Sequence, residues 1–254
     1  MDLISNLIDI KAALQVKGSA KQVHKDADSG RTMKKIEDEH PLDVSYASLK
    51  CSMQPIAASE DEYKMMDTYI QNTSDGRRLQ VLDLFKIERE GEATVFNPDK
   101  LGNKKLLFHG SRFSNYVGIL SQGMRIAPPE APKTGYNFGK GVYFADFAGK
   151  SAPYCCPYLS NGVGIFVMCE VALGTPQELR EPDCDADILP AGRHSTHALG
   201  RIRPDPSGSR TIEGDIEVPL GKKQDFSGGY MGHNEFIVYN TRQVRMRYLV
   251  KVKM

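Results

Sequence analysis

The C-terminal stretch VRMRYLVKVK, residues 244–253, alternates apolar and basic side chains along its length. A repeat of two residues is typical of a β-strand that buries one face and exposes the other. We therefore predict a half-buried strand here. Its basic outer face is interpreted as a solvated sheet surface in preference to a nucleic-acid-binding patch.

The region that precedes this strand has a similar β character. Residues 79–87 are rich in strand-forming side chains, residues 106–108 form a short apolar run, and residues 163–173 are apolar at nearly every position. An apolar run without alternation is typical of a central strand that is covered on both faces. Turn-rich loops at residues 127–129, 204–208 and 225–232 separate these strands. The sequence thus predicts a mostly β domain over residues 77–254.

The N-terminal part has a helical pattern instead. One apolar face is formed by Leu3, Leu7, Ile10 and Leu14. This spacing predicts an amphipathic helix that needs a partner surface. A second helix is expected to begin at Ser59, where Glu62 three residues later completes a capping box. We assign residues 1–76 to a partial helical segment with a linker.

Composition and charge restrict the class of protein. The chain has 254 residues, of which 40% are hydrophobic and 26% charged, which suits one packed domain with a smaller attachment. It has 33 basic and 32 acidic residues and no long block of Lys or Arg, so we expect no direct DNA binding. Residues 1–76 hold 9 basic and 13 acidic side chains, which leaves a positive balance after residue 76 that suits an anionic ligand.

The cysteines and the apolar segments indicate a compartment. The five cysteines form no Cys-x-x-Cys pair and cannot all pair, so we expect a reducing environment, in cytosol or nucleus. Asp9 and Lys11 interrupt the apolar start, which is also too short to span a bilayer, so no membrane association is expected. His194 and His197 lack the spacing of a zinc protease and are assigned to a loop, and no metal is expected.

Two segments in the middle of the chain carry candidate chemistry. His109, Gly110 and Ser111 end an apolar run, where a histidine is either structural or ligand-binding. Residues 135–146 combine three glycines with four aromatics and a lysine, and match neither a dinucleotide fingerprint nor a P-loop. They predict either a wall on which a flat ring stacks or hairpin aromatics packed in the core.

Two further segments add a cation, a hydroxyl and a carboxylate. Lys150, Ser151 and Tyr154 are spaced to share one face of a short helical turn, although an ordinary surface turn has the same spacing. Glu235 stands at the start of an apolar strand, directly after a glycine-rich loop. It gains a functional role only if it faces His109 and Tyr143.

Taken together, the four segments resemble the catalytic domain of the poly(ADP-ribose) polymerases, in the DNA-damage-dependent branch. The stretches that carry the resemblance are residues 108–111, 118–132, 135–146 and 234–239, in consistent order within residues 79–253. Residues 1–72 resemble only the last part of that branch's regulatory helical domain. The resemblance implies an α+β ADP-ribosyltransferase fold of two apposed, antiparallel-rich β-sheets with short helices, residues 77–254 being the catalytic domain.

The resemblance also implies site residues. The catalytic triad would be His109, Tyr143 and Glu235, with Lys150 positioning Glu235 or contacting the acceptor. The implied NAD-binding residues are His109, Gly110, Ser111, Gly118, Arg125, Tyr136, Tyr143, Ser151 and Tyr154. Of these, Gly110 and Ser151 would hold the nicotinamide carboxamide, and Tyr154 and Tyr143 would flank its ring.

The implied activity is NAD+-dependent poly(ADP-ribosyl)ation. Nicotinamide would be released and ADP-ribose transferred to protein side chains and onto growing ADP-ribose chains, with NAD+ as substrate and no metal. The alternatives are mono-ADP-ribosyl transfer and a non-catalytic NAD- or ADP-ribose-binding module. Partners would be acceptor proteins, including the chain itself, and the polymer; the branch implies a nuclear role in DNA repair. No zinc finger, BRCT or WGR module is recognised, so we expect activity without DNA.

Overall fold

The computed structural model describes residues 41–96, 98, 101–127 and 136–254. The helix predicted from Leu3 to Leu14 lies outside the described residues, as does the turn at residues 128–129. The helices are α2 (Pro41–Ala47), α3 (Asp61–Asn72), α4 (Glu92–Val95), α5 (Tyr116–Gln122) and α6 (Ala148–Ser151). Short 3-10 turns are η1 (Phe113–Asn115), η2 (Ala152–Cys155), η3 (Pro157–Leu159), η4 (Pro206–Gly208) and η5 (Thr241–Gln243). None of these helices has the length and apolar character needed to cross a membrane.

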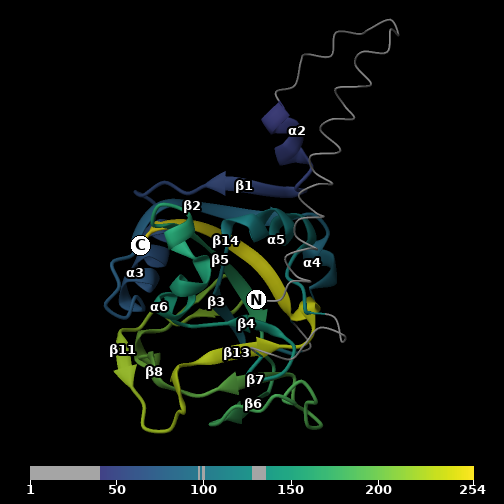
Figure 1. The fold of residues 1–254 in the computed structure, drawn as a ribbon, viewed down its shortest axis with the longest axis vertical. Coiled ribbons are helices and arrows are strands. Elements are labelled where there is room, and N and C mark those ends of the chain that lie inside the picture. The colour runs from purple at the N-terminus through teal and green to yellow at the C-terminus, as the bar shows by residue number, and fades with distance from the viewer. Residues whose placement is uncertain (1–40, 97, 99–100, 128–135) are drawn as a thin grey trace, which may run out of the picture.

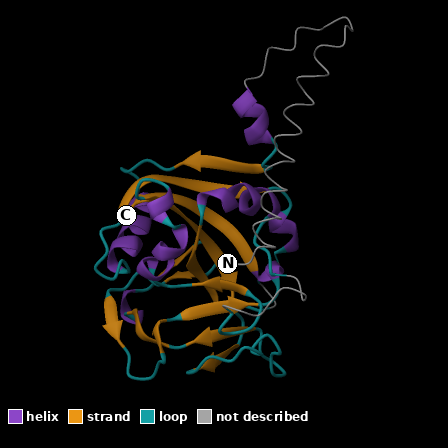
Figure 2. Cartoon of the chain, in the orientation of Figure 1, coloured by secondary structure: helices purple, strands orange, loops and turns teal. Residues whose placement is uncertain are grey.

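The strands form three sheets, two of which lie one above the other in Figure 1. The seven-stranded sheet has the order β1 (Cys51–Pro55), β2 (Gln80–Arg89), β14 (Val244–Lys253), β5 (Val163–Ala172), β3 (Lys104–Ser111), β10 (Ile216–Val218) and β9 (Arg210–Ile212). The four-stranded sheet has the order β4 (Val142–Phe144), β13 (Glu235–Val238), β7 (Ser195–Ala198) and β6 (Pro176–Leu179). The three-stranded sheet has the order β11 (Lys223–Asp225), β8 (Gly200–Pro204) and β12 (Met231–His233). Antiparallel pairs predominate among the described strands, with parallel pairs at β3–β10, β6–β7 and β8–β12, and the helices are short (Figure 2).

The central position predicted for the apolar run at residues 163–173 is confirmed. β5 lies fourth in the seven-stranded sheet, between β14 and β3. Phe166 and Met168 pack into one hydrophobic core, whereas Val167 and Cys169 pack into another on the opposite face. Both faces of this sheet are therefore covered, which explains why the run shows no alternation.

The C-terminal strand departs from the predicted single buried face. A β-bulge lies between Met246 and Tyr248, and an extra residue in one strand reverses which face the following side chains occupy. Val244 and Met246 accordingly pack in the core beside α5, but Tyr248 and Val250 pack in the core beside α3. The alternation correctly indicated a strand, but the expectation of one buried face was wrong, because a bulge leaves no mark in a period-two pattern.

The basic side chains of β14 meet carboxylates of the neighbouring strand. Lys251 Nζ lies 2.9 Å from Asp83 Oδ2, and Arg245 Nη2 lies 3.4 Å from Glu88 Oε1. This pairing supports the interpretation of a solvated sheet surface over a nucleic-acid patch.

The start of α3 also differs from the sequence prediction. The helix begins at Asp61, its N-cap is Glu60, and Ser59 caps nothing. The Glu60 carboxylate instead accepts a hydrogen bond from the Ala57 N–H at 2.6 Å, so it closes the preceding turn. The capping box at Ser59 was therefore wrong, since a nearby acidic side chain satisfied a different backbone donor.

Helix α3 packs directly onto the seven-stranded sheet. The Tyr69 hydroxyl donates to the Leu106 carbonyl at 3.0 Å, and its ring centroid lies 4.4 Å from that of Phe108. At its C-terminal end, the Thr73 carbonyl accepts a hydrogen bond from the Gly149 N–H of α6. α3 thus supports both β3 and α6, and the predicted division at residue 76 stays a prediction.

One backbone pair joins the two larger sheets. Phe108 of β3 exchanges both of its backbone hydrogen bonds with Ala145, at 2.8 and 3.0 Å, just beyond the end of β4. The end of β3, the four-stranded sheet and α6 are therefore held together at one place.

Candidate active site

A buried ion pair joins α6 to the start of β13. Lys150 Nζ lies 2.6 Å from Glu235 Oε1, and the side chains are 22% and 9% exposed. The two residues come from segments 85 positions apart in the chain. Burying a carboxylate costs free energy unless it is paired, and the ammonium group of Lys150 offsets that cost here. The remaining lone pairs of the carboxylate can accept hydrogen bonds from a ligand placed beside it.

Tyr143 lies on the same sheet face as Glu235. It is the direct cross-strand partner of Ile237, and opposite residues of an antiparallel pair share a face, as do Ile237 and Glu235 along β13. Burial raises the pKa of the Tyr143 phenol well above its usual value, and the nearby Glu235 carboxylate adds to this. The phenol donates to the Gly139 carbonyl at 2.7 Å and accepts from the Phe138 N–H at 3.0 Å, which fixes its orientation.

The ring of His109 is held by the backbone of Tyr143. Its Nδ1 lies 2.9 Å from the Tyr143 carbonyl oxygen. A carbonyl only accepts, so Nδ1 carries the proton and Nε2 remains an acceptor. Burial lowers the pKa of His109, which favours this neutral form at neutral pH. Two links therefore support the prediction that His109, Tyr143 and Glu235 converge. The Tyr143 carbonyl holds the His109 ring, and the pairing of β4 with β13 places Tyr143 on the same sheet face as Glu235.

Gly110 presents its peptide groups to an edge of the sheet. Because Phe108 bonds to Ala145, its N–H and C=O point away from β5, and Gly110, two residues on in a regular ladder, points the same way. A Cβ on Gly110 would lie 2.3 Å from the Ser151 carbonyl oxygen, so only glycine fits beside α6.

The short helical turn predicted around Lys150 is confirmed by α6 and η2. Ser151 is 4% exposed, and its hydroxyl makes a long hydrogen bond of 3.4 Å to the Phe108 carbonyl. Tyr154 is 51% exposed, so a ring face is accessible. A buried hydroxyl thus lies in the residue that contacts Gly110, and an accessible aromatic ring lies three residues further along the same turn.

The remaining predicted residues lie at the end of β3, in α5 and in the segments that follow α5. The Ser111 hydroxyl accepts from the Asn115 amide at 2.9 Å, and Gly118 is buried in α5. Arg125 donates to the Gln122 side chain at 2.9 Å, and the ring of Tyr136 lies 6.1 Å from that of Tyr143. Gly135, at the start of the segment 135–146, lies outside the described residues, as do residues 128–132 of the segment 118–132.

Two polar residues without a role in the sequence analysis lie beside the ion pair. Asp146 and Asn234 are 4% and 5% exposed, and the Asn234 amide donates to Asp146 Oδ2 at 2.8 Å. Both fall inside the quoted motifs, Asp146 three residues after Tyr143 and Asn234 directly before Glu235. The sequence signal that could have identified this contact is the polar side chain of Asn234, directly before Glu235.

The two histidines at 194 and 197 are structural. His197 lies on strand β7, so its assignment to a loop was wrong, and its ring stacks on Phe236 with centroids 4.4 Å apart. His194 Nδ1 accepts a hydrogen bond from the Thr175 N–H at 3.1 Å.

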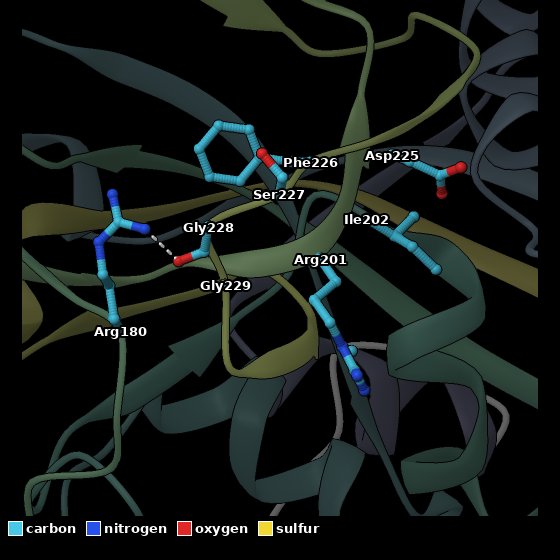
Figure 3. A pocket seen from close by; sticks show the side chains of 9 residues that line it. Arg180, Arg201, Ile202, Asp225, Phe226, Ser227, Gly228 and Gly229 are labelled. Atoms are coloured by element: carbon cyan, nitrogen blue, oxygen red, sulfur yellow. Dashed lines mark hydrogen bonds between the residues drawn. The ribbon is translucent and has the colours of Figure 1, made fainter.

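A cavity of about 810 Å³ lies outside the cluster around Glu235. It is lined by Arg180, Arg201, Ile202, Asp225, Phe226, Ser227, Gly228, Gly229 and Gly232, none of which was predicted as a site residue. In Figure 3 the side chains of Arg180, Arg201 and Asp225 point in different directions, and Arg180 donates to the Gly228 carbonyl. The charges are mixed and do not converge, so the cavity lacks the features of a site for one anion.

The comparisons agree with the resemblance seen in the sequence. Residues 60–254 match the family described as the poly(ADP-ribose) polymerase catalytic domain. The chain belongs to this family. It is 47% identical to human poly [ADP-ribose] polymerase 2 over 224 residues, and 45% identical to the Arabidopsis thaliana protein of that name over 225 residues. It is 41% identical to Xenopus laevis poly [ADP-ribose] polymerase 1 over 261 aligned positions.

The aligned regions differ in how much of each protein they include. They cover 85%, 86% and 100% of this poly(ADP-ribose) polymerase domain chain, but 38%, 35% and 24% of the three relatives. The chain therefore spans between about a quarter and two fifths of the length of the curated relatives it matches. Membership of the family confirms the expected α+β fold.

Proposed function

We propose that the chain is an NAD+-dependent poly(ADP-ribosyl)transferase. It releases nicotinamide and transfers ADP-ribose to acceptor proteins, including itself, and onto growing ADP-ribose chains. The observation that carries the proposal is the buried Glu235 carboxylate, paired with Lys150 and sharing a sheet face with Tyr143. Family membership supports the same activity.

The nicotinamide half of NAD+ fits the edge of β3. Its carboxamide needs one acceptor and one or two donors, which the Gly110 peptide and the Ser151 hydroxyl provide at the place where Gly110 approaches α6. The accessible ring of Tyr154 offers a stacking plane, and Tyr143 closes the other side. This fit depends on glycine at position 110, since a side chain there would displace Ser151.

The adenosine half is assigned to the residues beyond β3. With its proton on Nδ1, His109 accepts a hydrogen bond at Nε2 from a ribose hydroxyl. Ser111 also meets this half, and Gly118, Arg125 and Tyr136 line its end of the site.

Glu235 stabilises the charge that develops during bond cleavage. Breaking the nicotinamide–ribose bond passes through an oxocarbenium-like state in which the ribose becomes positive and a neutral base leaves, as in glycoside hydrolysis. A carboxylate placed at the ribose hydroxyls lowers the energy of this state, most effectively where water is excluded. Lys150 holds the carboxylate in place before the substrate arrives.

Elongation uses the same carboxylate. Glu235 orients the incoming hydroxyl of the acceptor, an ADP-ribose unit that is already attached, for attack on the ribose carbon that nicotinamide leaves, so polymer formation is preferred over mono-transfer. No metal takes part. We place the protein in the nucleus, in DNA repair, and propose that this chain acts without DNA.

The test incubates the purified chain with NAD+ labelled in the adenylate, with and without nicked DNA. Released nicotinamide, a labelled protein band and a ladder of polymer lengths are expected, at equal levels in both samples. Labelled protein without a ladder would indicate mono-transfer, and retained NAD+ without release would indicate a binding module. Strong stimulation by DNA would contradict DNA-independent action.

A further inference from the structure

Two contacts join the start of β13 to α6 and to the turn that precedes α6. Lys150 contacts Glu235, and four residues earlier Asp146 accepts the Asn234 amide hydrogen at 2.8 Å. The contact between Asp146 and Asn234 is the inner and more buried one, since the two residues are 4% and 5% exposed. The contact between Lys150 and Glu235 is the outer one. Lys150 has 22% of its side chain exposed, so solvent and ligands reach this outer contact but not the inner one.

The Asn234 side chain is held from a second direction. Its Oδ1 accepts a hydrogen bond from the Gly200 N–H of β8 at 2.9 Å. The backbones are in close contact here, since a Cβ on Gly200 would lie 2.1 Å from the His233 carbonyl carbon and 2.3 Å from the Asn234 nitrogen. Asn234 is therefore fixed on both of its polar atoms, immediately before Glu235.

We propose that Asp146 and Asn234 are positioning residues that keep the Glu235 carboxylate in its reactive orientation when a substrate draws it away from Lys150. The inference rests on the proposed function, because it concerns the role assigned to Glu235. Hydroxyl groups of a bound ribose compete with Lys150 for the carboxylate oxygens, which weakens the outer contact. The inner contact touches no substrate and keeps the backbone at residues 234–235 in place through the reaction.

The polarity of the inner contact permits a swap experiment. In Asn234→Asp two carboxylates face each other, so at a pH high enough for both to be charged the hydrogen bond is lost and the charges repel. In the double variant D146N/N234D the amide at 146 donates to the carboxylate at 234, which still accepts from the Gly200 N–H. Both hydrogen bonds are then restored with the side chains exchanged. Asn234→Ala removes the contact without adding charge and serves where Asn234→Asp fails to fold.

The expected result is a loss in kcat rather than in binding. A displacement of about 1 Å costs about 10²-fold, so we expect kcat for nicotinamide release to fall by about 10- to 100-fold in Asn234→Ala and Asn234→Asp. KM for NAD+ should stay within about threefold of the unchanged chain, and the double variant should regain most of the rate. Unchanged kcat in Asn234→Ala, or a folded double variant as slow as Asn234→Asp, would overturn the proposal.

Failure of the proposed function is recognised separately. If the unchanged chain releases no nicotinamide, the activity is wrong, and the positioning claim is then decided by a crystal structure of Asn234→Ala. Displacement of Glu235 from Lys150 in that structure supports the claim, whereas an unchanged contact contradicts it.

Discussion

Gly110 and Ser151 approach so closely that a methyl group on Gly110 would lie 2.3 Å from the Ser151 carbonyl oxygen. The same methyl group would also lie 3.1 Å from Cys155 Sγ. Non-bonded carbon and oxygen atoms do not approach to 2.3 Å, so any side chain at position 110 must push α6 away from β3. α6 carries Lys150 and Ser151, and therefore the glycine sets the position of both.

Gly110→Ala should weaken NAD+ binding and turnover together. The shift of α6 separates the Ser151 hydroxyl from the Gly110 peptide, and overpacking costs about 1–3 kcal/mol of stability. We expect kcat/KM for NAD+ to fall by about 10²-fold, measured as nicotinamide release over a range of NAD+ concentrations.

Gly232→Ala is the matched control for this substitution. A Cβ at this exposed glycine meets no atom within 4 Å, so the change in chain entropy is similar without the clash. Its kcat/KM should stay near that of the unchanged chain. Equal effects of the two substitutions would show that the contact with Ser151 is not responsible.

Glu235→Gln should separate binding from transfer. Glutamine has the size and most of the hydrogen bonding of glutamate but no charge, so NAD+ binding should persist by calorimetry. Transfer should fall by about 10²- to 10³-fold, because the developing positive charge on the ribose loses its stabilising carboxylate. Polymer lengths on a gel should collapse to short products, and polymers of normal length from this variant would refute the role of Glu235.

Lys150→Met should reduce both stability and rate. It removes the ammonium group that lies 2.6 Å from Glu235 and leaves a largely buried carboxylate without this partner. Since Lys150 retains some solvent exposure, we expect a loss of about 1–2 kcal/mol by chemical denaturation, below the range for a fully buried pair. Lys150→Arg keeps the positive charge and should lose less stability. A methionine variant with normal kcat would show that the ion pair does not position Glu235.

The sequence predicted the main strands better than it predicted local detail, and the site residues stay a prediction. The central strand β5 and the turn at Lys150 follow from patterns that span several residues, which tertiary contacts reinforce. The capping box at Ser59 failed because Glu60 satisfied the Ala57 N–H instead, a choice between neighbouring acceptors that residue types alone do not settle.

The wrong expectation for β14 and the absence of Asp146 from the predicted site have a shared cause. The bulge after Met246 and the contact between Asp146 and Asn234 both depend on which segments meet in space, across 88 residues in the second case. The proposed triad follows from the family resemblance, since its members lie in recognisable motifs. The residues that we propose hold Glu235 in place lie in the same motifs, but their contacts are created only by the fold.

Asp146 should make the fold less stable as the pH rises, which is opposite to the usual effect of a carboxyl group. Burial raises the pKa of this carboxyl from its ordinary 3.8 to about 6, against the lowering effect of the Asn234 hydrogen bond; Lys105 lowers it slightly and Glu217 raises it. The folded state therefore binds more protons than the unfolded state between pH 4 and 6. The free energy contributed by this group is highest below about pH 4 and declines as pH rises through 6, by at most about 3 kcal/mol.

Asp146→Asn should remove this cost, because its amide oxygen still accepts from Asn234 and carries no charge. At pH 8 we expect the melting temperature to rise by several degrees, at about 2–4 °C per kcal/mol for a domain of this size. The gain should shrink as pH falls and disappear near pH 4. Asp225→Asn, which removes an exposed carboxylate of β11, is the control and should show no such gain. A melting temperature of Asp146→Asn that tracks the unchanged chain at every pH would mean that burial of the charged carboxylate carries no cost.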